Sequence, residues 1–192
     1  SSLWADVVAV TNNRLFDLVV LGCMGLILAM CFFRSEAGDR RRLVAMGIVM
    51  LLGALVINQF GHLLPVSRPS PTLTVADALR VTQLSAIPTK DSSSDSFPGD
   101  HALFLMIFAG FALCYLPRWA GVLAILMVPL FSAPRILSGA HWLTDVYVGA
   151  LGLTLLCLPL LLLTGLSDVL IGWFASRLSL GSRRRSTGHP SD

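Results

Sequence analysis

The chain has 192 residues, of which 55% are hydrophobic and only 13% are charged, and its formal net charge is +3. Because a soluble domain carries about 25% charged residues, the composition argues against a soluble protein and favours an all-α membrane protein. The small positive charge comes without any nucleic-acid-binding motif, so a nucleic-acid partner is not expected.

Five apolar segments, taken in chain order, predict a polytopic bundle of five transmembrane helices, because a spanning helix needs about 20 apolar residues. They are Leu15–Phe33, Leu43–Leu64, Ala102–Leu116, Ala120–Phe131 and Leu143–Leu163. The third and fourth are short, so we expect them to extend into "FPGDH" and "SAPRI". The segment 165–178 has apolar residues at helical spacing, which fits an amphipathic helix on the membrane surface or an extension of the last span. At this length, residues 1–192 are expected to form one domain.

Basic residues alternate along the predicted crossings, and the positive-inside rule then gives an orientation. The connection 34–42, the turn 117–119 and the tail from about 165 to 192 are basic, whereas the connection 65–100 has mixed charge. We therefore expect the basic sites in the cytoplasm, and 65–100 in the periplasm of a bacterial inner membrane. Five crossings leave the N-terminus outside, so a sixth helix is expected upstream of Ser1.

Three polar clusters fall on the predicted outer face, and they hold Arg68, His101, Arg135, His141 and Asp145. If residues 141–163 are helical, Asp145 can accept a hydrogen bond from one ring nitrogen of His141 and leave the other as a nucleophile. Arginine forks suit phosphate oxygens, and the expected helix start after Gly99 offers free backbone N–H groups to an anion. This combination predicts phosphoryl transfer, in which positioning and electrostatics supply most of the catalysis.

Each of these residues also has a purely structural interpretation. His141 beside Trp142 fits an interfacial anchor, and Arg135 fits a cation that extends from a helix end to the membrane surface. Asp145 is harder to explain in this way, because a carboxylate in an apolar helix costs up to about 2.5–3.5 kcal/mol at the bilayer centre. It therefore needs a partner, for which His141 is the nearest candidate. For the loop residue Lys90, the sequence favours neither a structural nor a functional role.

The three clusters resemble the signature of the type 2 phosphatidic acid phosphatase superfamily, which is Lys-x6-Arg-Pro, Pro-Ser-Gly-His and Ser-Arg-x5-His-x3-Asp. The strings "SRP", "PGDH" and "PRILSGAHWLTD" match it at Arg68, Pro69, Pro98, His101, Arg135, His141 and Asp145. The chain departs from the signature at its lysine and at two of its serines, which fall on Gly61, Gly99 and Pro134. Lys90 and Ser96 are candidates to replace the lost phosphate contacts.

Longer strings, among them "VTNNRLFD" and "IPTKDSSSDSFPGDHA", are similar to the lipid A phosphotransferase branch of that superfamily. The resemblance implies transfer of a phosphate from undecaprenyl diphosphate to the 1-phosphate of lipid A through a phosphohistidine, with release of undecaprenyl phosphate. It implies that His141 is the nucleophile, that Asp145 orients it and that His101 is the acid. Phosphate-binding roles are implied for Arg68, Arg135, Gly99 and Lys90. No metal ion or other cofactor is implied.

Two other functions stay open at this point. A hydrolase of the same superfamily would release phosphate from undecaprenyl diphosphate or a related lipid, and the signature residues do not separate hydrolysis from transfer. A non-enzymatic membrane protein could instead hold an anionic lipid head group, although binding alone does not need an oriented imidazole. The choice between the 1- and 4′-phosphate of lipid A is open, and so is a small regulatory membrane partner.

Overall fold

The computed structural model describes residues 3–183, and within this range all of the regular secondary structure is helical. The long helices are α2 (Arg14–Arg34), α3 (Ala37–Leu63), α6 (Asp100–Tyr115), α7 (Arg118–Leu137), α8 (Leu151–Leu162) and α9 (Leu166–Arg183). A π-helical turn, η1 (Asp145–Ala150), leads directly into α8. The short helices are α1 (Leu3–Thr11), α4 (Pro71–Thr74) and α5 (Val81–Leu84). The expected fold class, a helical bundle, is therefore confirmed.

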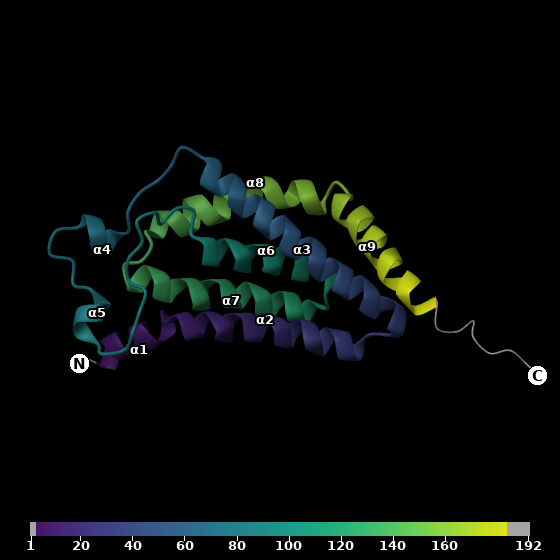
Figure 1. Cartoon of the computed structure of the whole chain (residues 1–192), viewed down its shortest axis with the longest axis horizontal. Helices are drawn as coiled ribbons and strands as arrows, with labels where there is room; N and C mark the ends of the chain where they lie inside the picture. Colours follow the sequence, from purple (N-terminus) through teal and green to yellow (C-terminus); the bar gives the residue numbers. More distant parts are fainter. Residues whose placement is uncertain (1–2, 184–192) are drawn as a thin grey trace, which may run out of the picture.

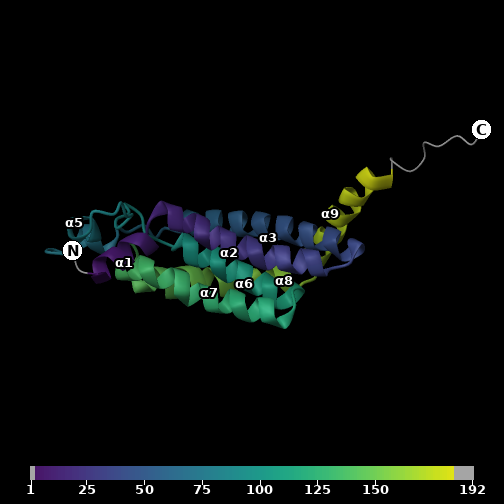
Figure 2. The same cartoon turned by 90° about the horizontal axis from the view of Figure 1, so that it is seen from below.

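Helices α2, α3, α6 and α7, followed by η1 with α8, run alternately between the two ends of an elongated bundle (Figures 1 and 2). One end carries α1, α4, α5 and the long connection 64–99, and we call it the loop end. The other end carries the α2–α3 and α6–α7 turns and the start of α9. This alternation places residues that are far apart in sequence at the same end.

Helix α6 is the central helix of the bundle, and it packs against α3, α7, η1 and α8. Its residues Leu103 and Phe111 belong to a core shared with α3 and α8, whereas Phe108 belongs to a core shared with α2 and α7. A helix that is apolar on all sides is expected to be surrounded by other helices. The composition of "ALFLMIFAGFAL" therefore explains the central position of α6.

The helix boundaries and the number of full-length spans differ from the expectation. Four segments are long and apolar enough to cross a membrane, namely Arg14–Arg34, Ala37–Leu63, Arg118–Leu137 and Asp145–Leu162. Helix α6, with 16 residues, is shorter, so four spans and one shorter apolar helix stand where five full spans were expected. Helices α6 and α7 do extend into "FPGDH" and "SAPRI". The expected connection 34–42 is largely helical, because α3 begins at Ala37.

The segment after the last span forms a separate helix and does not extend α8. Helix α8 ends at Leu162, and Gly165, with φ at +77°, separates it from α9. A positive φ suits glycine, which has no β-carbon to clash, so the helical path breaks here. Helix α9 packs against α3, where it buries Ser167 and Ile171. The end of the tail, residues 184–192, lies outside the described residues.

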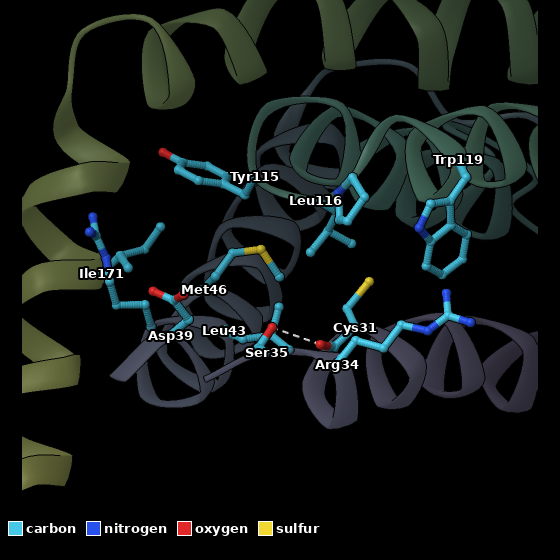
Figure 3. Close-up of a pocket in the computed structure, with 12 residues that line it drawn as sticks. Cys31, Arg34, Ser35, Asp39, Leu43, Met46, Tyr115, Leu116, Trp119 and Ile171 are labelled. Atoms are coloured by element: carbon cyan, nitrogen blue, oxygen red, sulfur yellow. Dashed lines mark hydrogen bonds between the residues drawn. The ribbon is translucent and has the colours of Figure 1, made fainter. Parts of the chain in front are cut away.

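A cavity of about 360 Å³ lies at the end of the bundle opposite the loop end, between α2, α3, α6, α7 and α9. Figure 3 shows Arg34 extending toward Trp119, and the guanidinium carbon of Arg34 lies 5.8 Å from the centre of the indole ring. Tyr115 points toward α9 (Figure 3), and its hydroxyl lies 2.6 Å from Ser167 Oγ. The basic residues Arg34 and Arg42 line this cavity.

Candidate active site

The chemistry-bearing residues meet at the loop end, where Gly99, His101, Ser132, Arg135 and His141 line one small cavity. Helix α6 begins at Asp100 and supplies His101, the last turn of α7 supplies Arg135, and the connection before η1 supplies His141. The two histidines therefore share one cavity, although they are 40 residues apart in sequence. The cavity measures only about 10 Å³, which is room for about one water molecule. A phosphate group that binds between the imidazole and the guanidinium must therefore sit at its mouth or move the lining side chains apart.

The hydrogen bond of His141 fixes its tautomer. His141 Nδ1 lies 2.8 Å from the backbone oxygen of Ser96. Because a carbonyl oxygen can only accept, Nδ1 carries the hydrogen and Nε2 has a free lone pair. The backbone N–H of His141 donates to the carbonyl of Arg135 at 3.1 Å, which holds the residue over the end of α7. The arrangement leaves Nε2 available as a nucleophile or base.

Burial lowers the pKa of the His141 imidazole below its usual 6.5, because the charged form loses solvation. The hydrogen bond to the Ser96 carbonyl and the charge of Asp145 oppose this effect, whereas Arg135 reinforces it. The net direction is downward. The neutral imidazole, which is the nucleophilic form, is therefore favoured at neutral pH.

Asp145 supports this part of the site differently from the expectation. Its Oδ2 lies 3.9 Å from His141 Nδ1, so the expected direct hydrogen bond is not formed. His141 lies before the helix, which begins at Leu143 and continues as η1 from Asp145, so the two side chains do not share a helical face. Oδ2 instead accepts from the backbone N–H of Trp142 at 2.8 Å, and Oδ1 accepts from Arg68 Nε at 2.9 Å.

Arg68 is the partner that a fully buried carboxylate requires. Asp145 has no exposed surface, and a buried charge without a partner would be strongly destabilising. Arg68 Nη2 also donates to Asp145 and to Thr144, and its guanidinium lies over the Trp142 ring at 5.6 Å. The side chain of Arg68 remains 37% exposed, so part of its fork faces the solvent side of the site.

Ser96 joins the Arg68 loop to His141, and the sequence indicated it only as a candidate phosphate contact. Its backbone N–H donates to the carbonyl of Arg68 at 2.9 Å, while its own carbonyl accepts from His141. Its hydroxyl also reaches the Arg68 carbonyl at 3.2 Å. Ser96 is 1% exposed, so it acts through these contacts on the position of the imidazole.

Asp17, in the first turn of α2, is a site residue that the sequence analysis missed. Its Oδ1 accepts from Arg135 Nη2 at 2.6 Å and lies 3.0 Å from His101 Nε2. Arg135 Nη2 lies 3.0 Å from the same nitrogen of His101. The only signal in the sequence was a carboxylate within the apolar segment 15–33. Asp17 thus holds the buried guanidinium and the second imidazole together.

Two glycines explain how this site departs from the family signature. Gly99 has φ at +85°, and a β-carbon there would lie 3.3 Å from the backbone oxygen of Asp145. A β-carbon on Gly61 would lie 2.7 Å from Leu153 and 2.9 Å from Pro98. The position at which the signature has its lysine is therefore closely packed, and any side chain there requires Leu153 and Pro98 to shift.

Lys90 lies in a different cavity from the two histidines. Its backbone is held by Asn12, whose carbonyl accepts from Lys90 N at 3.2 Å and whose amide donates to Lys90 O at 2.5 Å. The cavity that Lys90 lines also contains Arg14 and Arg80. Within residues 3–183, no group of three or more His, Cys, Asp or Glu side chains is placed to hold a metal ion.

Comparison with known proteins agrees with this geometry. Residues 42–166 match the PAP2 superfamily, and this range contains Arg68, His101, Arg135, His141 and Asp145. A lipid A 1-diphosphate synthase of Escherichia coli is 48% identical over 177 residues, which cover 92% of this chain and 74% of that protein. A second Escherichia coli protein, named "Putative undecaprenyl-diphosphatase YbjG", is 27% identical over 62% of this chain and 56% of its own length.

No solved structure matches the chain. The family match covers more than half of the residues and includes the cavity with both histidines. One cavity thus brings together a proton-free imidazole nitrogen, a second imidazole and a buried guanidinium. This arrangement is suited to phosphoryl transfer. The chain belongs to the PAP2 superfamily, a superfamily of enzymes that act on lipid phosphates.

Proposed function

We propose that this protein transfers a phosphate from undecaprenyl diphosphate to the 1-phosphate of lipid A. The observation that carries the proposal is the 48% identity, over 92% of the chain, to a lipid A 1-diphosphate synthase. The site geometry supports the reaction class, because His141, whose Nδ1 is held by the Ser96 carbonyl, lines one cavity together with Arg135 and His101. Residues 1–192 are proposed to act as one membrane domain.

The proposed reaction has two steps through a covalent intermediate. His141 Nε2 attacks the terminal phosphorus of undecaprenyl diphosphate, so that a P–N bond forms and the P–O bond to undecaprenyl phosphate breaks. His101 protonates the leaving oxygen, and Arg68 and Arg135 stabilise the charge on the transferred group. A 1-phosphate oxygen of lipid A then attacks the phosphohistidine, so that a P–O bond forms and the P–N bond breaks, which regenerates the free imidazole of His141. His101 takes up the proton of the attacking phosphate and is restored as the acid. Asp145 contributes by holding Arg68 and the backbone of Trp142.

The proposed orientation places the loop end in the periplasm and makes the chain cross the membrane five times. Arg34, Arg40, Arg41, Arg42 and Arg118 all lie at the opposite end of the bundle. The positive-inside rule assigns such an end to the cytoplasm. Helix α6 is only about 24 Å long at 1.5 Å per residue, which is less than the roughly 30 Å of the hydrocarbon core. It packs against α3, α7 and α8, so its ends are surrounded by protein.

Hydrolysis of undecaprenyl diphosphate is the second candidate, and the name of the 27% identical relative favours it. The two functions differ in whether water or a lipid phosphate reaches the phosphohistidine. In both, His141 is the nucleophile, so the residues of the cavity support either one. The wider similarity to the lipid A 1-diphosphate synthase is the reason to prefer transfer.

One assay separates these functions. Detergent-solubilised protein is incubated with undecaprenyl diphosphate labelled in its terminal phosphate, with and without lipid A. We expect label in lipid A diphosphate, with little free phosphate, and we expect His141→Ala to remove both products. Release of free phosphate at an equal rate with and without lipid A would establish the hydrolase instead. If neither product forms in either incubation, binding of an anionic lipid head group is the remaining function.

A further inference from the structure

A second polar cavity, of about 460 Å³, opens at the loop end and has no assigned role. The start of α2 and the segment 80–92 form it, and Arg14, Arg80, Lys90, Thr82 and Asp91 are among the residues that line it. Three of its side chains are cationic and one is acidic. Helices α1 and α5, which pack against each other, lie beside the start of α2 in Figure 1.

The positive charge of this cavity is compensated only in part within the stretch of chain that the structure describes, because three cations face one carboxylate. Neither Arg14 nor Lys90 forms an ion pair with a carboxylate of residues 3–183. Arg80 donates only to a backbone oxygen, that of Thr72, at 3.4 Å. The cavity therefore presents two guanidiniums and an ammonium to whatever occupies it.

Asp91 offsets part of this positive charge, but it forms no ion pair with any of the three cations within residues 3–183. It is 4% exposed, and its Oδ2 accepts from the backbone N–H of Thr82 at 3.0 Å and from the Thr82 hydroxyl at 2.8 Å. A carboxylate held in this way shapes the loop around the cavity. The side chains that remain available to a ligand are donors, and two of them are forks suited to phosphate oxygens.

Helix α2 and a chain of hydrogen bonds connect this cavity to the catalytic one. Arg14 precedes Asp17 by three residues on α2, which is about 4.5 Å along the helix axis, and Asp17 holds Arg135 and His101. On the other side, Asn12 donates to Lys90 O at 2.5 Å and to Ser138 Oγ at 2.8 Å. Ser138 in turn donates to the carbonyl of Arg135 at 3.1 Å.

We infer that this cavity binds the second phosphate of the acceptor lipid while the first is presented to His141. The inference rests on the proposed function. Lipid A carries phosphates at both ends of its disaccharide, whereas undecaprenyl diphosphate has all its charge at one end of an apolar chain. Only the acceptor can therefore place one anionic group in the catalytic cavity and another in the cavity of Arg14, Arg80 and Lys90. The cavity thus selects the acceptor and fixes which phosphate is extended.

The test compares two acceptors: lipid A with both phosphates, and lipid A that keeps only its 1-phosphate. Both can accept at the 1-position, so the ratio of their KM values reports on the second phosphate alone. We expect the wild-type protein to have a KM about tenfold lower for the doubly phosphorylated acceptor, equivalent to about 1.4 kcal/mol. The double variant Arg14→Gln/Arg80→Gln should reduce the ratio nearly to one. Arg118→Gln, a matched change at the opposite end, should keep the wild-type ratio.

Each outcome supports or overturns the inference. Equal KM values in the wild-type protein, or a wild-type ratio in the double variant, would show that the cavity does not recognise the second phosphate. If the double variant loses transfer to both acceptors, the ratio of the two KM values is measured instead in the single variants Arg14→Gln and Arg80→Gln. A wild-type ratio in both single variants overturns the inference. Failure of the wild-type protein to transfer phosphate to either acceptor refutes the proposed function itself, and the inference with it.

Discussion

Removal of the Asp17 carboxylate should slow the reaction without disturbing substrate binding to the same degree. Asp17 Oδ1 holds Arg135 at 2.6 Å and His101 at 3.0 Å, and the side chain of Arg135 is only 6% exposed. Asp17 therefore connects a cation and an imidazole that the proposed reaction uses in the same step. It touches no reacting atom in that mechanism, so we treat it as a positioning residue.

The expected magnitude follows from the kind of hydrogen bond that is lost. A bond to a charged group contributes about 1.5–3 kcal/mol and a neutral one about 1 kcal/mol, and the 35% exposure of Asp17 favours the lower end of this range. Asp17→Asn keeps one acceptor and should reduce kcat about tenfold, since about 1.4 kcal/mol corresponds to a factor of ten. Asp17→Ala removes both bonds and should reduce kcat about a hundredfold.

The assay is steady-state transfer of labelled phosphate to lipid A, with kcat and KM for the donor determined separately. Asp39→Asn, which removes an exposed carboxylate at the opposite end of the bundle, is the matched control. A thermal melt of each variant separates loss of positioning from loss of folded protein. Asp17 has no positioning role if the folded Asp17→Ala variant retains a kcat within about twofold of the control, or if only its KM for the donor changes.

Three further predictions concern the imidazole and the two packed glycines. The pKa of His141 is lowered from its usual 6.5 by burial, and the neutral form is the nucleophile. Activity should therefore persist below pH 6.5 and fall only as the pH passes the lowered pKa, as a pH profile of kcat/KM would show. Gly61→Lys should lower the melting temperature sharply and not improve turnover, because a β-carbon there already meets Leu153 and Pro98. Gly99→Ser should cost about 1–2 kcal/mol of stability, because a non-glycine residue at positive φ is strained; chemical denaturation measures this, and an unchanged midpoint would contradict it.

The residues of the candidate site were largely accessible from the sequence, but their contacts were not. The spacing of Arg135, His141 and Asp145 is local, and it indicated a cation, an imidazole and a carboxylate at one helix mouth. The spacing also suggested a direct bond between His141 and Asp145. That bond is absent because the helix starts only after His141, and the carbonyl of Ser96, which is 45 residues away in sequence, binds the imidazole instead.

Local composition determined the apolar helices of this protein and the end of the bundle at which its polar residues lie, because hydrophobic periodicity and charge bias act over a few neighbouring residues. Tertiary structure alone decided the pairing of Asp17 with Arg135, across 118 positions, and the separation of Lys90 from the catalytic cavity. Such contacts depend on the path of the connection 64–99 and on which helices become neighbours. Gly61 and Gly99 permit the close contacts of this arrangement with Pro98, Leu153 and the backbone of Asp145, and sequence spacing carries no information about such contacts.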